Sequence, residues 1–181
     1  MPDNHTHDAV VKKMYDALRA LMDEKDYADI SITDIVSSAR VSRMAFYRNY
    51  KDKRDILIGR FEVILQGYSE QFSRAGGLLQ RELWDFFFNE LKSSDLLRYI
   101  RKAGLIYSAI DVFRETFLTY YRDVFQWPLD EPGVMLVVYQ RMGLLAGVLG
   151  FLADHPQDAD NTLLTDAVLA AISEDNVCRN R

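Results

Sequence analysis

Apolar residues recur at steps of three and four along almost the whole chain. No stretch alternates apolar and polar residues with the period of two that a half-buried strand requires. This periodicity predicts an all-α fold of about nine helices. The expected helices cover residues 8–23, 32–39, 43–49, 53–74, 79–92, 94–103, 106–126, 131–153 and 161–174.

The pair Gly76-Gly77 is the clearest break in this pattern, and it divides the chain into two expected domains. Residues 1–54 hold three helices that end in a helix-turn-helix arrangement. The helix over 53–74 connects this unit to a larger helical domain over residues 75–181, for which we expect regulatory and dimerisation roles.

Composition narrows the class of protein. The chain has 181 residues, a net charge of −5 and one cysteine, Cys178, so no intrachain disulfide can form and a reducing cytoplasm is expected. The N-terminus lacks the basic and apolar regions of a secretory signal. The apolar run at residues 143–153 is shorter than the roughly 20 residues of a membrane span. We therefore expect a soluble cytoplasmic protein.

No pattern of catalytic or metal-binding residues is visible in the sequence. His5 and His7 stand in a polar N-terminal segment, His155 precedes a proline, and Cys178 has no histidine near it. Gly76-Gly77 lacks the spacing of a phosphate-binding loop. The sequence thus predicts a protein that is not an enzyme and that uses no metal or cofactor.

A basic segment stands out within this acidic chain. Residues 40–60 contain seven Lys/Arg and two Asp, a local charge of +5. A nucleic-acid-binding surface needs such a local excess of positive charge, although a solvated helix face produces the same pattern.

The residues around this segment predict a helix-turn-helix. Ser31 and Ser42 are expected to cap two short helices, with Asp34 at the capping-box position of the first. The residues expected to hold the second helix against the first are Val41, Ala45 and Phe46. The second helix is then the one that enters the major groove of DNA.

The outer face of that second helix supplies the expected DNA contacts. Arg43 suits a bidentate contact to guanine, and Asn49 suits adenine or a phosphate. Tyr47 and Lys53 suit phosphate contacts, Lys53 beside amides that face outward at the start of the next helix. The alternative for single residues is that Tyr47 is a core aromatic and Arg48 is merely solvated. The full predicted set is Ser31, Thr33, Ser42, Arg43, Met44, Ala45, Tyr47, Arg48, Asn49 and Lys53.

The stretch "SITDIVSSARVSRMAFYRNYKDKRDI", residues 31–56, resembles the signature of the tetracycline-repressor (TetR) family of bacterial transcriptional regulators. The residues at matching positions are Ile35, Ala39, Val41, Ser42, Phe46, Tyr47, Tyr50, Lys53 and Ile56. Three positions depart from the family pattern. Arg40 replaces a glycine in the turn, Met44 replaces a small residue at the DNA surface, and Asn49 replaces histidine or tyrosine. Methionine at that surface would make apolar contacts, for instance with a thymine methyl.

The resemblance implies a dimerising, often ligand-sensing helical body, and the C-terminal pattern is similar to the subgroup of dihydroxyacetone-kinase regulators. Aromatic residues are frequent over residues 85–127, and they are candidates to line a pocket for a small apolar or aromatic effector. The residues proposed to bind it are Phe87, Tyr107, Phe117 and Tyr121. The alternative is that these side chains fill a core.

The last two expected helices are candidates for a dimer interface, because small residues on them permit close helix approach. The proposed residues are Gly143, Ala146, Gly147, Gly150, Leu163, Ala167, Ala170 and Ala171. The resemblance implies that two such helices from each subunit form a four-helix bundle, so that two recognition helices lie about one DNA turn apart on a palindromic operator. An intrachain hairpin is the alternative.

Two functions remain open at this point. One is a homodimeric repressor that a small effector releases from its operator. The other is a DNA-binding adaptor whose body binds a protein partner. A closed aromatic cavity favours the repressor, and a solid core with an exposed apolar groove favours the adaptor.

Overall fold

The computed structural model describes residues 4–75, 81–123, 126–155 and 160–173. Within these ranges the chain forms nine α-helices, one short 3₁₀ helix and no strand, so the predicted all-α fold is confirmed. The elements are α1 (Asn4–Glu24), η1 (Tyr27–Asp29), α2 (Ile32–Ala39), α3 (Arg43–Asn49), α4 (Arg54–Ala75), α5 (Arg81–Ser93), α6 (Leu96–Lys102), α7 (Ile106–Asp123), α8 (Pro132–Asp154) and α9 (Asn161–Ser173).

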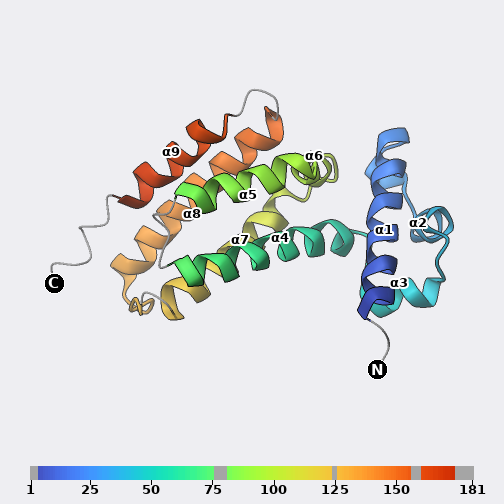
Figure 1. Cartoon of the computed structure of the whole chain (residues 1–181), viewed down its shortest axis with the longest axis horizontal. Helices are drawn as coiled ribbons and strands as arrows, with labels where there is room; N and C mark the ends of the chain where they lie inside the picture. The colour runs from blue at the N-terminus through green and yellow to red at the C-terminus, as the bar shows by residue number, and fades with distance from the viewer. Residues whose placement is uncertain (1–3, 76–80, 124–125, 156–159, 174–181) are drawn as a thin grey trace.

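The helices form two groups along the long axis of the molecule (Figure 1). We call α1–α3 the head and α5–α9 the body. Helix α4 begins at the head and runs along the body, and α9 lies on the far side of α5 and α8. The helix ends agree with the predictions to within about three residues, except that α1 begins at Asn4 and so includes His7, which was expected in a polar tail.

Both helices of the helix-turn-helix start at the predicted caps. Ser31 Oγ accepts a hydrogen bond from Asp34 N at 3.1 Å, and Asp34 Oδ2 accepts one from Ser31 N at 2.9 Å. Ser42 Oγ accepts one from Ala45 N at 3.0 Å. A hydrogen bond from Lys25, together with those from Ser31, lowers the pKa of Asp34 to about 2, so the capping carboxylate stays charged at neutral pH.

The turn between α2 and α3 requires a left-handed backbone. Arg40 has φ 52° and ψ 45°, the conformation for which glycine is preferred at the end of a helix. The turn is closed by a hydrogen bond from Val41 N to Val36 O at 3.0 Å. Arginine in place of the expected glycine therefore keeps the left-handed turn, and its Cβ atom makes this backbone conformation strained.

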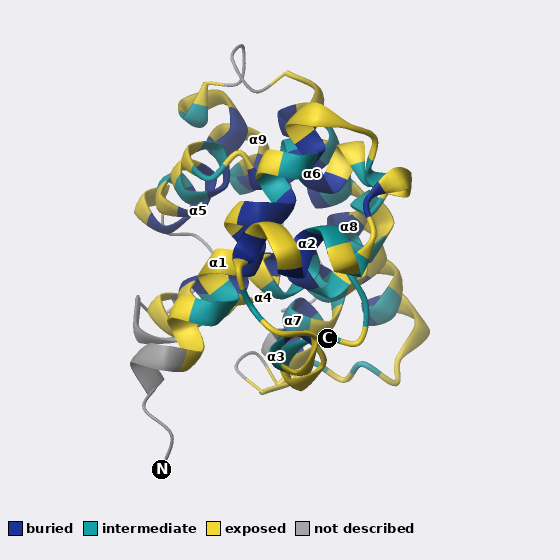
Figure 2. Ribbon diagram, turned by 90° about the vertical axis from the view of Figure 1, so that its right-hand side faces the viewer, coloured by how far each residue is buried: buried dark blue, intermediate teal, exposed yellow. Residues whose placement is uncertain are grey.

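One hydrophobic core runs from the head into the body without interruption. Ile35 of α2 and Phe46 of α3 are fully buried together with Leu18 of α1, and the same cluster continues along α4 through Leu57 and Phe61. Figure 2 looks onto the head and shows buried residues on the inner sides of α1 and α2. This continuity means that the packing of α4 fixes how the head sits on the body.

Aromatic side chains fill the middle of the body. The rings of Phe113 and Phe117 stack with centroids 4.5 Å apart, and Phe87 and Tyr121 continue the cluster at 6.0 Å from Phe113 and 6.2 Å from Phe117. Three of the four predicted effector-binding residues therefore lie in this cluster. Tyr107 does not, because α7 turns it outward and its side chain is 82% exposed, which corrects the expected grouping.

Helix α8 is more apolar than its neighbours. On length and hydropathy it is the one helix in the described part of the chain that would suffice to cross a membrane. Core helices meet the same criterion, and Val138, Leu145 and Leu152 of α8 are buried against the body. Arg141 of this helix is buried, and its Nη1 donates to Tyr121 Oη at 2.9 Å. In this fold α8 is a core helix.

The strained turn predicts a stabilising substitution. We expect Arg40→Gly to raise the free energy of unfolding by about 1 kcal/mol, because glycine adopts the left-handed conformation without the clash of a Cβ atom. Urea denaturation followed by circular dichroism measures the change. Arg40→Ala is the matched control, since it removes the guanidinium and keeps the Cβ. An equal gain in both variants would show that charge, and not backbone strain, is the cause.

Candidate nucleic-acid interface

Helix α3 is held in the head by its inner side. The Phe46 ring is fully buried and contacts the ring of Tyr50 at 5.8 Å between centroids, while Val41 and Ala45 are half-buried. The predicted inner residues are thus confirmed. Because the helix has only seven residues, this single large side chain sets the face that α3 turns outward.

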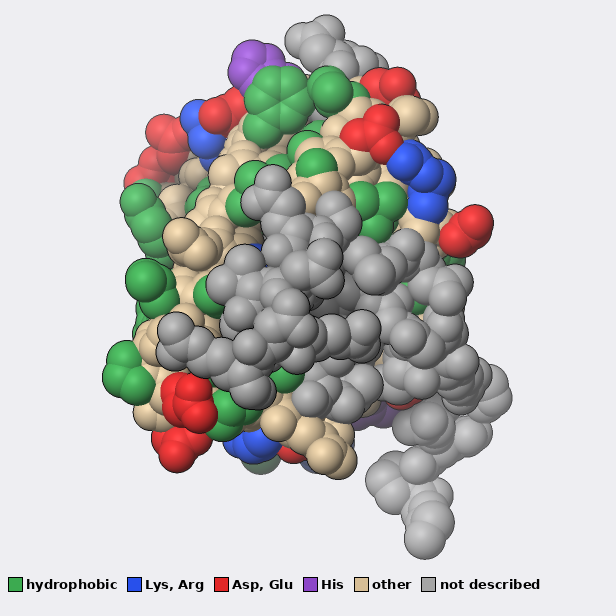
Figure 3. Space-filling view, turned by 90° about the vertical axis from the view of Figure 1, so that its left-hand side faces the viewer, with side chains coloured by type: hydrophobic (Ala, Val, Ile, Leu, Met, Phe, Trp, Pro, Cys, Tyr) green, Lys and Arg blue, Asp and Glu red, His purple; other side chains and the backbone are tan. Residues whose placement is uncertain are grey.

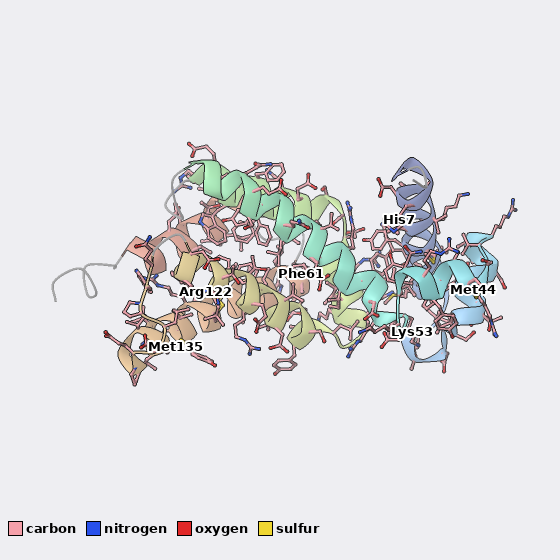
Figure 4. All side chains as sticks on the ribbon, turned by 90° about the horizontal axis from the view of Figure 1, so that it is seen from below. His7, Met44, Lys53, Phe61, Arg122 and Met135 are labelled. Atoms are coloured by element: carbon pink, nitrogen blue, oxygen red, sulfur yellow. The ribbon has the colours of Figure 1, made fainter. Side chains whose placement is uncertain are left out.

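The opposite face of α3 points away from the rest of the molecule. Met44 is 72% exposed and Tyr47 is 58% exposed, and Arg43 and Arg48 are exposed beside them. In Figure 4 Met44 lies at the outer end of the head, away from the body. Four of the predicted contact residues therefore share one outward surface, which we call the α3 surface (Arg43, Met44, Tyr47 and Arg48).

Arg43 is joined to the preceding helix. Its Nη2 donates a hydrogen bond to the hydroxyl of Thr33, which lies exposed in the first turn of α2. The structure therefore brings Thr33 and Arg43 together at one edge of the α3 surface. In this arrangement the guanidinium points along the protein surface toward the N-terminus of α2.

Asn49 lies differently from its predicted position. Its side chain is half-buried, and Nδ2 donates to the carbonyl oxygen of Ala45 at 2.6 Å within α3. The amide thus bonds to its own helix, and the expected outward position is not observed. The periodicity did not reveal this, because Asn49 is the last residue of α3, directly before the half-buried Tyr50.

Lys53 is bound to the protein itself. Its ammonium donates to the carbonyl oxygens of Tyr27 at 2.6 Å, Ala28 at 3.3 Å and Ile30 at 2.7 Å, and lies 4.3 Å from the centroid of the Tyr27 ring. Burial raises the pKa of Tyr27 to about 12, so this phenol is neutral beside the ammonium. An ammonium has three donors, and three carbonyl groups accept from this one.

The start of α4 is also occupied by protein groups. Asp55 Oδ2 accepts from Lys51 N at 2.8 Å and from Asp52 N at 3.2 Å, and Asp52 Oδ1 accepts from Arg54 N at 2.7 Å. Amides that were expected to face outward here are bound by carboxylates. A phosphate at this helix start would meet two negative charges, so the expectation of an open anion site is wrong.

Exposed basic side chains without an ion-pair partner among the described residues lie on and beside the α3 surface. They include Arg48 on this surface, and Arg40 and Lys51 next to it. Arg40 precedes α3 in the chain, and Lys51 follows it. The sequence analysis counted Arg40 and Lys51 in the basic segment without assigning them a contact. Their position in the sequence, directly before and after α3, could have indicated that they lie near the DNA-contacting surface.

The predicted dimer residues lie mainly on the surface of two neighbouring helices. On α8, Gly143 and Gly147 are exposed and Ala146 and Gly150 are half-buried; on α9, Leu163, Ala167 and Ala170 are exposed. The side chain of Ala171 is outside the described residues. The sequence analysis missed three exposed large side chains of α8, Leu136, Tyr139 and Phe151, at 62, 56 and 41% exposure. Figure 3 views the end of the body, with hydrophobic side chains along one edge.

No group of three potential metal ligands is close together in the residues that the structure describes. Cys178 and the side chain of His5 fall outside these residues. The hollows found at described residues are open grooves. One of about 850 Å³ lies between α4 and α7, and one of about 910 Å³ lies where α1 and α4 meet the end of α5. Neither is lined by Phe87, Phe117 or Tyr121.

Comparison with known protein families finds a match within the head and the first residues of α4. Residues 15–59 match the model of the bacterial regulatory proteins of the tetR family. The match runs from the middle of α1 into α4 and includes the whole α3 surface. No curated protein and no solved structure matches the chain. Over residues 15–59 the chain is thus similar to these regulatory proteins, and the match does not extend to the body or to the dihydroxyacetone-kinase regulator subgroup.

The contacts of Lys53 and Lys51 predict that the same substitution affects protein stability at Lys53 and DNA binding at Lys51. Lys53→Met should lower the free energy of unfolding by about 1–3 kcal/mol, because three carbonyls lose their charged donor. Lys51→Met should leave stability unchanged and reduce the salt dependence of DNA binding by about one unit in log K against log salt. Urea denaturation and fluorescence anisotropy at several salt concentrations measure the two effects. A stable Lys53→Met protein with the shallower salt dependence would instead restore the phosphate contact for Lys53.

Proposed function

We propose that this chain is a cytoplasmic, homodimeric repressor of bacterial transcription, whose tetR-family head binds a palindromic operator. The observation that carries the proposal is the α3 surface, a capped helix anchored by Phe46 that projects polar and apolar side chains away from the body. A helix presented in this way fits the major groove, which is about 12 Å wide.

Electrostatics support a nucleic-acid partner. The chain carries a net charge of −5, yet Arg40, Arg48 and Lys51 are exposed around α3 without ion-pair partners in the described residues. Phosphates on either side of the groove would pair with these groups, while the acidic remainder of the protein repels the DNA. This charge pattern favours docking through α3 and disfavours docking through the body.

The glycines of α8 support dimerisation. A Cβ atom added to Gly143, Gly147 or Gly150 would meet nothing within 4 Å in this chain. Glycine inside a helix costs about 0.5–1 kcal/mol relative to alanine, and the packing of one subunit does not account for it at these positions. A second α8 that approaches closely along this stripe would account for it, with Leu136 and Tyr139 as flanking apolar contacts.

Regulation would pass through the joint between head and body. Asp23 at the end of α1 accepts hydrogen bonds from Tyr99 Oη at 2.8 Å and Arg98 Nη1 at 3.4 Å, both of α6, and the bond from Tyr99 lowers the pKa of Asp23. Lys102 of α6 donates to Met22 O at 3.1 Å. Since α6 also packs on α4, α7 and α8, a ligand that shifts α6 would move the head.

An effector of the repressor would act on the aromatic cluster of the body. In the repressor function, a small apolar or aromatic molecule would separate the rings around Phe87, Phe117 and Tyr121, which are in mutual contact without it. The second candidate function, a DNA-binding adaptor, draws support from this filled core and from the exposed apolar side chains of α8. A protein partner would then take the place of the effector.

DNA binding itself is tested by selection from random duplexes, followed by anisotropy on the selected sequence. We expect a palindromic site that binds at least about 10³-fold more tightly than random DNA, with affinity falling as salt rises. A double variant, Arg48→Glu with Lys51→Glu, keeps the fold because both side chains are exposed, and should lose both specific and random binding. A folded wild-type protein that binds no duplex at about 50 mM salt would contradict the proposal.

Dimerisation is tested by placing a large charge on the glycine stripe. Gly147→Glu leaves the packing of one subunit unchanged, since the added side chain enters open space, and it should convert a dimer into a monomer in sedimentation. Gly67→Glu on α4 is the matched control, because Gly67 is exposed and its added Cβ is also unopposed. If wild type sediments as a monomer at micromolar concentration, or Gly147→Glu remains a dimer, this interface is wrong.

A further inference from the structure

The centre of the α3 surface is apolar. Met44 and Tyr47 are three residues apart and therefore lie on one face of the helix, one turn above the other. Met44 is 72% exposed and is the second residue of α3, two positions after the cap residue Ser42. A methionine so placed makes no contribution to the core of this chain, which leaves its side chain available to a partner of α3.

Two hydrogen-bonding side chains of α3 are already bound to other groups of the protein. Arg43 donates to Thr33 at the edge of the surface, and Asn49 donates to the Ala45 carbonyl inside its own helix. These are the two residues whose chemistry suits guanine and adenine. With both bonded to the protein, the exposed apolar group in the first turn of α3 is the flexible Met44 thioether chain.

The major groove offers one apolar group to such a side chain, the C5-methyl of thymine. Resting on the DNA-binding function proposed above, we propose that Met44 reads a thymine methyl in each operator half-site, and that Arg43 with Thr33 contacts the DNA backbone. Base selection at this position then comes from burial of a methyl group against methionine. The same methyl is present on 5-methylcytosine, so a methylated cytosine at that position satisfies the same contact.

The test removes single methyl groups from the DNA. Each thymine of the selected half-site is replaced in turn by uracil, which differs from thymine only by the absent methyl. Burial of a methyl contributes about 0.8 kcal/mol, so one position should lower wild-type affinity about 4-fold. Met44→Ala should bind more weakly and show no difference between thymine and uracil there. Arg48→Gln is the control variant, and it should weaken binding overall while keeping the difference.

A second measurement checks the chemistry of the contact. At the sensitive position, a cytosine–guanine pair with 5-methylcytosine should bind wild type more tightly than the same pair with cytosine, and Met44→Ala should not distinguish the two. A half-site without thymine, or a uracil effect that persists in Met44→Ala, would overturn the reading by Met44 while DNA binding stands. Absence of duplex binding in all proteins would instead overturn the proposed function.

Discussion

The Lys53 ammonium is the contact on which the head depends. One side chain at the start of α4 binds three carbonyl oxygens in the connection from α1 to α2, at 2.6, 3.3 and 2.7 Å. Those carbonyls belong to residues 27–30, where the chain leaves α1 and has not yet entered α2, and among them Tyr27 O also accepts from Ile30 N at 3.2 Å. The lysine thereby ties α4 to the beginning of the helix-turn-helix, and in Figure 4 it lies between Met44 and the body.

This tie gives α4 two roles. Lys53, directly before the first residue of α4, carries the bond to the head, and the inner side of the helix carries the core through Leu57 and Phe61 into the aromatic cluster. The polar contacts between Asp23 and α6 form a second connection. Two separate connections fix the angle between the head and the body, whereas a single connection would allow the head to rotate. A change inside the body that moves α4 and α6 by different amounts would therefore change the orientation of α3, which is what a regulator of DNA binding requires.

Local chemistry accounts for the parts of the fold that the sequence predicted well. Ser31 and Ser42 start their helices through bonds to residues three positions away, so a short window of sequence contains both partners. The left-handed backbone at Arg40 was indicated only by the family resemblance, which implies a glycine at that position. Lys53 and Asn49 were misassigned for the opposite reason. A lysine in a basic segment suits a phosphate, and nothing local shows that its partners are carbonyls 23 to 26 residues earlier. Tyr107 differs from Phe113 and Phe117 only in its angular position around α7, which the first turn of a helix defines poorly.

Both candidate functions would use the exposed side of α8 as a binding surface. A homodimer and a protein partner would both use Leu136, Tyr139 and the glycine stripe, because these are the apolar groups that the body leaves uncovered along this helix. Close approach over glycine requires a smooth opposing surface, and a second copy of α8 supplies one from the same three glycines. An unrelated partner would have to supply its own. The glycine spacing therefore favours self-association on α8. An adaptor function would then need a different surface, such as the polar groove between α4 and α7.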